Sequence, residues 1–545
     1  MTDPMRSAPE PIARLRDPSF VPPDRELPPL FDHLAATDDD DQADIVARAL
    51  ARRGPAATAL ARERWAPAPP ALRARLVRLY ARLARGPDGQ NALDAMLAAL
   101  DDDAPKVRRA AAFALGKAQK PDLEPRLLAR WRVEQDVHVR RSLAEALGKL
   151  GGPTALAELR AAAADEGPLG AALDRAKLTL ERSVARSTEA SRIDLDARPP
   201  HPLDLVVHCR AGLERWLADD LARGSVSPAS SVSSVSPVGP GTLRARLEGP
   251  PQSLLEARLM LWFGFPLPPE PLADGRVAAL TRALDGRLAR EIFATFTRGP
   301  RRFRLAWSDG AHRRADAWAL ASELARRPGA PQNDPSESPW EARAHERDGT
   351  LYVTLVPLAY DDPRFAYRRR EVPGASHPTI AAALASAGGI RPDDVVWDPF
   401  VGSGLELVER GLLGPYRALF GTDLLDEALD AAHENLASAG LENVHLERAD
   451  ARSYRPPLQP TLIVTNPPFG RRVARGDDLA SLYERFLGNA ARRLAPGGRL
   501  VWITPRPDPC VRAAVAFGLE PRMRQTVDMG GFRAELQAYE KGAPD

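Results

Sequence analysis

The chain has 545 residues, of which 44% are hydrophobic and 27% charged, and a formal net charge of +2. This length exceeds what one hydrophobic core organises, so we expect several domains, while the near-neutral charge does not by itself indicate a nucleic-acid partner. The sequence lacks both an apolar run of about 20 residues and an N-terminal apolar signal, so we expect neither a transmembrane helix nor a secretory signal peptide. The two cysteines, Cys209 and Cys510, match no metal-ligand spacing, so we expect a cytoplasmic protein without a metal site.

The N-terminal part begins with residues 1–38, which are rich in proline and charge and are predicted to form a disordered lead-in. Residues 39–195 have helical patterning and an internal repeat. The segments 107–109, 114–117 and 121 recur at 139–141, 146–149 and 153, a constant offset of 32 residues. This period predicts an α-solenoid, and the repeat resembles the short HEAT repeats of bacteria. Such repeats usually present a surface to a partner, here a protein partner; a helical appendage without a ligand is the alternative.

Residues 200–372 have a mixed α+β pattern. Strands are predicted at 203–208, 302–307 and 351–355, and a helix at 211–217. The Ser/Pro/Gly-rich stretch 224–241 is predicted to be a flexible loop or linker.

Arginine is clustered at three places in the second half of the chain, near 298–304, 368–370 and 471–475. Guanidinium groups suit phosphate oxygens, so each cluster is a candidate for RNA contact. Ordinary solvated cations are the alternative, because arginine is the dominant basic residue throughout this sequence.

Residues 373–545 alternate strand and helix signals, which predicts a parallel, Rossmann-like α/β sheet with helices on both faces. In an open sheet of this kind, functional residues follow the carboxyl ends of the strands. The predicted strands are 394–397, 418–421, 444–447, 462–465 and 500–503, and residues 527–532 fit a terminal antiparallel hairpin.

A glycine turn follows the first of these strands, with Asp398 at its start. Gly402 and Gly404 let the backbone approach a ligand without a Cβ clash, and Phe400 and Ser403 belong to the same turn. The adjacent carboxylate argues against a pyrophosphate ligand and suits an amine, such as the α-amino group of S-adenosylmethionine. We therefore expect these five residues to bind that cofactor. The other expected cofactor contacts follow the next strands and are Asp423, Leu424, Asp450, Ala451 and Asn466.

The second and third strands also end in acidic residues. Asp423, followed by Leu424, ends the second strand, where a carboxylate can accept both ribose hydroxyls of the cofactor. Asp426 fits a first-turn helix charge instead. Asp450 and Ala451 close the third strand, and for either acid a simple helix N-cap is the alternative.

Residues 466–470 (NPPFG) follow the fourth strand and indicate the reaction. Pro467 and Pro468 stiffen the backbone and have no N–H, which leaves their carbonyls available to a substrate. If Asn466 Oδ1 and the Pro467 carbonyl each accept one N–H of a base amino group, its nitrogen is held near sp³ geometry with the lone pair facing the methyl donor. Phe469 offers a ring for a flipped-out base, a contact worth about 1–3 kcal/mol. A proline-rich turn without chemistry is the alternative.

Taken in order, the glycine turn, residues 421–423 (GTD), Asp450 and residues 466–470 resemble the amino-group methyltransferases of the class I fold over about residues 376–540. Residues 208–215 and the junction at 365–378 resemble the THUMP-domain-containing RNA (guanine-N2)-methyltransferases, the UPF0020 type of RNA methylase. The resemblance implies that Asp450 accepts from the adenine amino group, and that a ferredoxin-like and THUMP-like region binds the acceptor end of tRNA.

The predicted function is S-adenosylmethionine-dependent methylation of a guanine N2 in RNA, with tRNA as the expected substrate. Methylation of 23S rRNA at guanine N2 and of DNA at adenine N6 are alternatives of the same class, although no DNA target-recognition domain is apparent. A non-catalytic RNA-binding scaffold is the alternative of a different class. The modified nucleotide, the number of methyl groups, the ligand of the repeats and the oligomeric state are not specified by the sequence.

Overall fold

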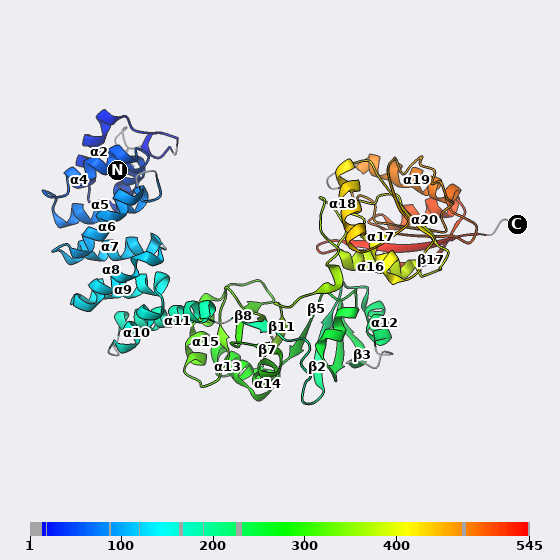
Figure 1. The fold of residues 1–545 in the computed structure, drawn as a ribbon, viewed down its shortest axis with the longest axis horizontal. Coiled ribbons are helices and arrows are strands. Elements are labelled where there is room, and N and C mark those ends of the chain that lie inside the picture. The colour runs from blue at the N-terminus through cyan, green and yellow to red at the C-terminus, as the bar shows by residue number, and fades with distance from the viewer. Residues whose placement is uncertain are drawn as a thin grey trace, which may run out of the picture. The chain divides into compact units, whose positions relative to one another are not determined.

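The computed structural model describes residues 14–17, 19–86, 89–118, 120–162, 167–188, 190–224, 232–470 and 476–542. Over these residues the chain forms two compact units, Met1–Ala190 and Ser191–Asp545 (Figure 1). Within the same ranges, none of the helices combines the length and the apolar character that crossing a bilayer requires.

The first unit is a stack of helices, blue to cyan in Figure 1, as the internal repeat predicts. The helices are α2 (Leu27–Ala36), α3 (Asp40–Ala51), α4 (Pro55–Glu63), α5 (Pro70–Leu83), α6 (Gly89–Ala98), α7 (Pro105–Ala118), α8 (Glu124–Val133), α9 (Val137–Leu150), α10 (Pro153–Ala161) and α11 (Pro168–Thr188). Helices α3, α5, α7, α9 and α11 each pack on the next member of that series. Gly116 and Gly148 permit this approach, because a Cβ at either position would lie 2.8 Å from an atom of Ala146 or Ala176.

The residues before the repeats are partly helical, so the predicted disordered lead-in is wrong for residues 27–36. Helix α2 buries Leu27, Phe31 and Leu34 in the core of the first unit. These positions recur at helical spacing and form an apolar face, which outweighs the high proline content of the segment. Residues 1–13 and 18 lie outside the described residues.

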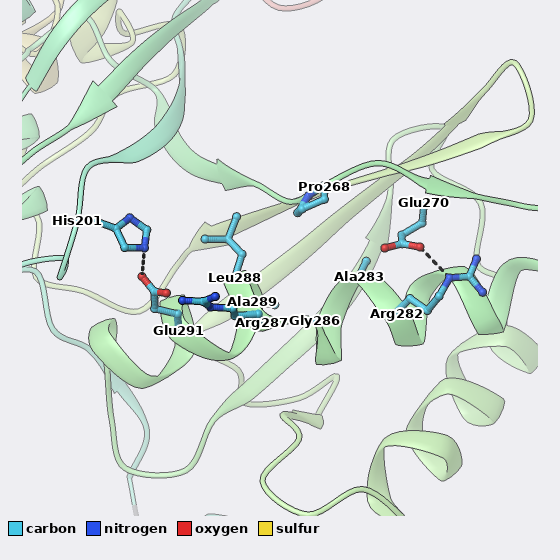
Figure 2. Close-up of a pocket in the computed structure, with 10 residues that line it drawn as sticks. All are labelled: His201, Pro268, Glu270, Arg282, Ala283, Gly286, Arg287, Leu288, Ala289 and Glu291. Carbon is cyan, nitrogen blue, oxygen red and sulfur yellow. Dashed lines mark hydrogen bonds and ion pairs between the residues drawn. The ribbon is translucent and has the colours of Figure 1, made fainter.

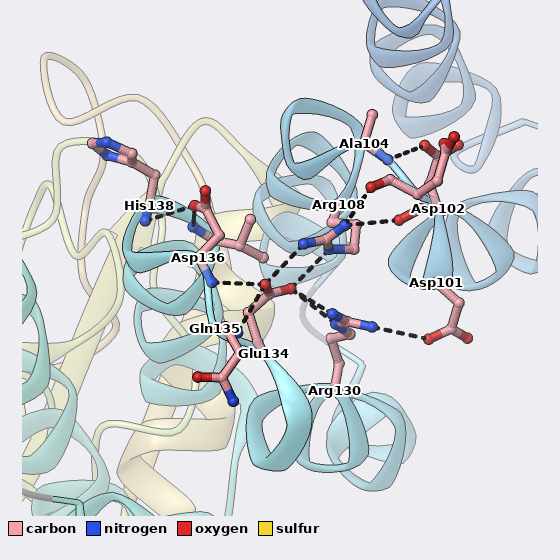
Figure 3. Close-up of polar contacts among 11 residues, drawn as sticks. Asp101, Asp102, Ala104, Arg108, Arg130, Glu134, Gln135, Asp136 and His138 are labelled. Atoms are coloured by element: carbon pink, nitrogen blue, oxygen red, sulfur yellow. Dashed lines mark hydrogen bonds and ion pairs between the residues drawn. The ribbon is translucent and has the colours of Figure 1, made fainter.

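A buried ion cluster joins α7 to the C-terminal end of α8 in the first unit (Figure 3). Arg108 of α7 donates to Glu134 through Nε at 2.8 Å and through Nη2 at 2.9 Å, and Arg130 of α8 donates to the same carboxylate at 2.9 Å. Burial opposes ionisation of Glu134, but the hydrogen bonds from Arg108, the Asp136 backbone and Arg130 lower its pKa to about 2. These two arginines therefore have a structural role, because both are paired with the ionised carboxylate of Glu134.

The second unit contains a mixed sheet that has nine strands among the described residues, in the order β3-β4-β2-β5-β11-β10-β8-β9, with β6 beside β11. Its strands are β2 (Leu203–His208), β3 (Val232–Gly239), β4 (Thr242–Leu247), β5 (Trp262–Pro266), β6 (Glu270–Pro271), β8 (Arg302–Trp307), β9 (Gln332–Asn333), β10 (Trp340–Arg347) and β11 (Thr350–Pro357). The helices of this region are α12 (Glu214–Gly224), α13 (Arg276–Asp285), α14 (Arg287–Phe296) and α15 (Arg314–Ala325), and a short ladder joins β1 (Arg192–Ile193) to β7 (Thr297–Arg298). The predicted α+β pattern is confirmed.

The predicted loop at 224–241 is wrong in its second half, which forms strand β3 at the edge of this sheet. An edge strand needs hydrogen bonds on one side only, so it tolerates Pro237 and the register shifts that β3 shows against β4. Residues 225–231 lie outside the described residues.

The C-terminal sheet has seven strands in the described part of the chain, in the order β14-β13-β12-β15-β16-β18-β17. The first five strands are parallel to one another, whereas β18 runs antiparallel to β16 and to β17. This arrangement confirms the predicted strands and the terminal hairpin. The strands are β12 (Val395–Asp398), β13 (Ala418–Asp423), β14 (Val444–Arg448), β15 (Leu462–Thr465), β16 (Arg499–Thr504), β17 (Leu519–Asp528) and β18 (Arg533–Lys541); the helices are α16 (Pro378–Gly388), α17 (Leu405–Leu413), α18 (Asp426–Ser438), α19 (Gly476–Arg493) and α20 (Pro507–Ala516).

Helices cover both faces of this sheet, as predicted. Along β12 the side chains alternate, so that Val396 packs in one core with Leu384 of α16. Trp397 points to the other face and packs in a second core with Phe486 of α19. The carboxyl ends of β12, β13 and β15 are thereby held at one rigid edge.

Glu409 of α17 connects the C-terminal sheet to the preceding region. Its fully buried carboxylate accepts from Nη2 of Arg258 at 2.9 Å and from the hydroxyl of Tyr367. On a second side, the N–H of Asp528 donates to the carbonyl of Ala211 at 2.9 Å. The two sheets of the second unit are thus joined by buried polar contacts.

Candidate active site

The glycine turn and the second strand meet at the carboxyl edge of the C-terminal sheet. The N–H of Gly402 donates to Asp423 Oδ2 at 3.1 Å, and the N–H of Val401 donates to the carbonyl of Thr422 at 2.9 Å. Gly402 and Gly404 have φ values of +50° and +82°, which side chains with a Cβ rarely adopt. The predicted turn is therefore built, and Asp423 is fixed directly beside it.

Asp398 lies at the base of the turn and has no solvent exposure, at 0%. Its Oδ1 accepts from Thr465 Oγ1 at 2.6 Å and from the N–H of Phe400 at 3.1 Å. Its Oδ2 is buried and has no hydrogen-bond partner among the described residues. Burial, followed by the nearby carboxyl of Glu406, raises the pKa of Asp398 well above its ordinary value. A cation beside the open oxygen would favour the ionised form of this carboxyl, so the position is suited to a cationic ligand.

Asn466 is held by a polar chain that starts on α17. Its Nδ2 donates to Ser376 Oγ at 2.7 Å, and the Ser376 hydroxyl donates to Glu406, which is only 3% exposed. With its amide nitrogen engaged, Asn466 presents Oδ1, which is buried and lacks a partner among the described residues. The structure therefore leaves an amide acceptor ready at the end of β15.

The rest of the 466–470 segment is fixed by aromatic residues. The carbonyl of Pro468 accepts from the hydroxyl of Tyr483 at 2.8 Å. Phe469 is half-buried and packs edge-to-face on Phe532, with ring centroids 5.6 Å apart. Within the described ranges, no hydrogen bond reaches the Pro467 carbonyl, which keeps the acceptor role that the sequence predicts for it.

The two acidic residues predicted to bind the cofactor after the second and third strands differ in their surroundings. Asp423 Oδ1 accepts from the N–H of Leu425 at 3.1 Å, and the Leu424 side chain is 56% exposed, an apolar surface next to a carboxylate. Asp450 is paired with Arg452, which donates to both of its oxygens, at 2.9 Å and 2.5 Å. This pairing lowers the pKa of Asp450, and its role toward adenine remains a prediction. Ala451 beside it is buried.

Three residues of the site escaped the sequence analysis as site residues: Thr465, Ser376 and Glu406. Thr465 immediately precedes Asn466 at the end of β15, so its position was a usable signal. Glu406 is a carboxylate in the first turn of a helix, next to the glycine turn and between the buried Leu405 and Leu407, which is also a signal. Ser376 carried none, because only the fold brings it to Asn466.

The arginine clusters are largely engaged in ion pairs. Arg298 pairs with Asp194 at 2.8 Å, Arg304 with Glu341 at 2.7 Å, and Arg368 with Glu371 at 3.0 Å. The cluster at 471–475 lies outside the described residues. The described clusters thus give little support to RNA contact through free guanidinium groups.

A cavity of about 390 Å³ lies elsewhere, at the start of helix α14 (Figure 2). His201 contacts Glu291 at 2.8 Å on one side of it, and Arg282 contacts Glu270 at 2.7 Å on the other. Its lining contains none of the residues of the glycine turn or of the 466–470 segment. It is separate from the site at the sheet edge.

Comparison with known proteins agrees with this geometry. Residues 366–535 match the family model described as RMKL-like, methyltransferase domain, and residues 93–172 match HEAT repeats. The first unit contains HEAT repeats, and the fold class predicted from the sequence is confirmed for both regions.

The methyltransferase domain has curated relatives. Over 204 residues the chain is 34% identical to a tRNA (guanine(6)-N2)-methyltransferase of Thermus thermophilus, which covers 37% of this chain and 59% of the relative. Over 134 residues it is 33% identical to a tRNA (guanine(10)-N2)-dimethyltransferase of Methanothermobacter thermautotrophicus, covering 24% of this chain and 39% of the relative. The chain thus spans less than two thirds of each of these relatives.

A solved structure extends the likeness beyond the methyltransferase domain. The crystal structure of TrmN from Thermus thermophilus matches with a TM-score of 0.51 and 25% sequence identity, covering 63% of this chain and 100% of that chain. This share is larger than residues 366–535 alone, so the fold similarity includes part of the region that precedes the methyltransferase domain.

Proposed function

We propose that the chain transfers a methyl group from S-adenosylmethionine to the exocyclic N2 of a guanine in RNA, with tRNA as the substrate. The observation that carries this proposal is the open Oδ1 of Asn466, whose Nδ2 donates to Ser376. Asn466 lies at the end of β15 and is followed by two prolines and Phe469. The names of the relatives, two of which are tRNA guanine-N2 methyltransferases, support the choice of nucleobase and RNA.

The residues present fit the cofactor. Asp398 Oδ2 is a buried acceptor without a described partner, suited to the α-amino group, and the Gly402 turn lets the backbone approach closely. Asp423 would hold the ribose hydroxyls, and the exposed Leu424 offers an apolar surface for the adenine ring. When bound, the cofactor supplies an electrophilic methyl group on a sulfonium. The other proposed cofactor contacts are Phe400, Ser403, Gly404, Asp450, Ala451 and Asn466.

The protein's part in the reaction is to orient a weak nucleophile. Asn466 Oδ1 and the Pro467 carbonyl accept the two N–H groups of the base, so the nitrogen lone pair is turned toward the methyl donor instead of into the ring. Phe469 stacks on the flipped base, and Phe532 supports Phe469 from the terminal hairpin. Pro468 fixes the segment through its bond to Tyr483.

For the remaining parts we propose that the region before the methyltransferase domain is THUMP-like and binds the acceptor end of tRNA, and that the HEAT repeats receive a partner. A cytoplasmic location agrees with the two cysteines, which are both buried and unbridged. The same site chemistry also fits 23S rRNA guanine N2 or DNA adenine N6, so the experiment must identify the methylated base and its polymer.

A deletion strain provides that test. Nucleosides from its tRNA, its rRNA and its DNA are compared with those of the parent strain by mass spectrometry. We expect one N2-methylguanosine to disappear from tRNA, and a copy of the gene on a plasmid to restore it. Loss from rRNA alone, or loss of N6-methyladenine from DNA, would redirect the assignment, and unchanged profiles in all three polymers would reject it.

A further inference from the structure

Two neighbouring helices of the first unit each carry a row of surface residues, and the positions of the two rows differ by the repeat offset of 32 residues. On α7 the row consists of Lys106, Arg109, Phe113 and Lys117, all exposed; on α9 it consists of His138, Arg141, Glu145 and Lys149, all exposed except the half-buried Glu145. Residues three and four apart lie on one helix face, so each set forms a continuous row. We call the two rows together the α7–α9 stripe.

Several cations elsewhere in the first unit are paired with carboxylates, whereas four of the five lysine and arginine side chains of this stripe are not paired within the described ranges. Arg108 and Arg130 are matched by Glu134 in the interior (Figure 3), and Arg132 on the outer layer pairs with Glu158 at 2.6 Å. By contrast, no ion pair with a carboxylate is formed within the described ranges by Lys106, Arg109, Lys117 or Lys149.

The acidic member of the stripe does not reach these four cations. Glu145 pairs with Arg141 at 3.1 Å and with Arg175 of α11 at 3.9 Å. Lys106 and Arg109, the two cations of the stripe nearest the N-terminus of α7, are therefore exposed to solvent without a carboxylate partner in the described part of the chain. Since α7 rises about 1.5 Å per residue, the row from Lys106 to Lys117 is roughly 16 Å long.

Phe113 stands in the middle of these cations with 48% of its surface exposed. The Nζ atoms of Lys117 and Lys149 lie 4.4 Å and 5.9 Å from its ring centroid, one from each helix. The close approach of α7 and α9 at Gly116 brings the second lysine within reach. An exposed aromatic ring flanked by two lysines combines the two contacts that bind single-stranded nucleic acid, base stacking and phosphate neutralisation.

We propose that the α7–α9 stripe is a second RNA-binding surface, on which Phe113 stacks on an unpaired base while Lys106, Arg109, Lys117 and Lys149 contact the phosphates on either side. The inference rests on the proposed function in that RNA is the substrate of the chain. An acidic protein segment would satisfy the cations but would leave the exposed ring without a matching partner, so RNA accounts for more of the surface.

The test measures binding of a fluorescently labelled tRNA transcript to the full-length protein at several salt concentrations. The stripe variant carries Lys106→Glu, Arg109→Glu and Lys149→Glu. The control variant carries Arg25→Glu, Arg62→Glu and Arg85→Glu, three exposed arginines of the same unit that lie off the stripe, and it makes the same change in charge. Thermal melts of both variants verify folding.

We expect the stripe variant to raise Kd at least tenfold and to reduce the slope of log Kd against log salt by about 2, at roughly 0.7–0.9 per phosphate contact. Phe113→Ala should weaken binding by about fivefold or more while leaving the salt slope nearly unchanged. Equal effects of the stripe and control variants, or an unchanged Kd, would overturn the proposal and favour a protein partner. Because binding is measured without methyl transfer, a failure of the proposed reaction would not be mistaken for a failure of this surface.

Discussion

Ser376 Oγ accepts a hydrogen bond from Asn466 Nδ2 at 2.7 Å while its own hydroxyl donates to Glu406. When Glu406 is ionised, the Ser376 hydroxyl must donate to its carboxylate and is left as an acceptor toward Asn466. The amide of Asn466 can therefore satisfy it only through nitrogen, which turns Oδ1 toward the proposed base. An asparagine that could otherwise flip is locked in one orientation.

Replacing Ser376 by alanine removes that lock. We expect Ser376→Ala to lower kcat about tenfold, corresponding to roughly 1–2 kcal/mol for a lost buried hydrogen bond, with little change in KM for RNA. Steady-state methyl transfer to tRNA measures both constants. Ser386→Ala, on nearby helix α16, is the matched control. An unchanged kcat in Ser376→Ala would show that Asn466 is oriented by something else.

The buried carboxyl of Glu406 should make stability depend on pH. Burial raises the pKa of Glu406 from 4.5 to about 7. The folded chain then binds more protons than the unfolded chain between these values, so the free energy of unfolding falls as pH rises from about 4.5 to about 7. At about 1.4 kcal/mol per pKa unit, the loss amounts to at most roughly 3 kcal/mol.

Glu406→Gln keeps an acceptor for Ser376 and removes the titration. We expect its free energy of unfolding to fall less than that of the wild type between about pH 5 and about pH 8 in denaturant titrations. Glu434→Gln, an exposed residue of α18, controls for the loss of one charge. Parallel pH dependence of the wild type and Glu406→Gln would contradict the burial argument.

Asp423 should be needed for cofactor affinity. Asp423→Ala removes the acceptor proposed for the ribose and also the bond to the Gly402 N–H, so we expect S-adenosylmethionine to bind at least about tenfold more weakly in calorimetry. Asp426→Ala, an exposed residue that pairs with Arg448, should leave affinity unchanged. Undiminished affinity in Asp423→Ala would remove this residue from the ribose role.

The contact between the two sheets of the second unit depends on the buried carboxylate of Glu409. Arg258→Ala leaves this fully buried carboxylate with the hydroxyl of Tyr367 but without its cation, so we expect a loss of about 3 kcal/mol in the free energy of unfolding. Arg276→Ala, which breaks the partly exposed pair with Glu346, should cost less than about 1 kcal/mol. Equal losses of the free energy of unfolding in the two variants would mean that the burial of Glu409 does not increase the cost of removing its cationic partner.

Much of the fold followed from local sequence patterns. The five parallel strands were predictable because each is a short apolar run followed by a turn or polar motif, and Asp398, Asp423 and Asn466 follow directly from strand ends. The repeat offset predicted the HEAT unit. Helix α2 was missed because its proline content obscured an apolar face at Leu27, Phe31 and Leu34.

The parts that could not be predicted depend on contacts distant in sequence. Ser376 reaches Asn466 across 90 residues and Glu406 across 30, so no local spacing reveals the chain between them. The pairing of Asp450 with Arg452 is local, but a strand-end acid and a nearby arginine have several rotamers. Only packing decides whether they meet.

The central claim is that Asn466 presents an exocyclic amino group of guanine in RNA to the methyl donor. The most direct measurement incubates the full-length protein with S-adenosylmethionine and tRNA, digests the RNA to nucleosides and identifies the methylated nucleoside by mass spectrometry, for the wild type and for Asn466→Ala. We expect N2-methylguanosine from the wild type and a rate at least about 10²-fold lower from the variant. Methylation at another position of the base, or an Asn466→Ala variant as active as the wild type, would contradict the account.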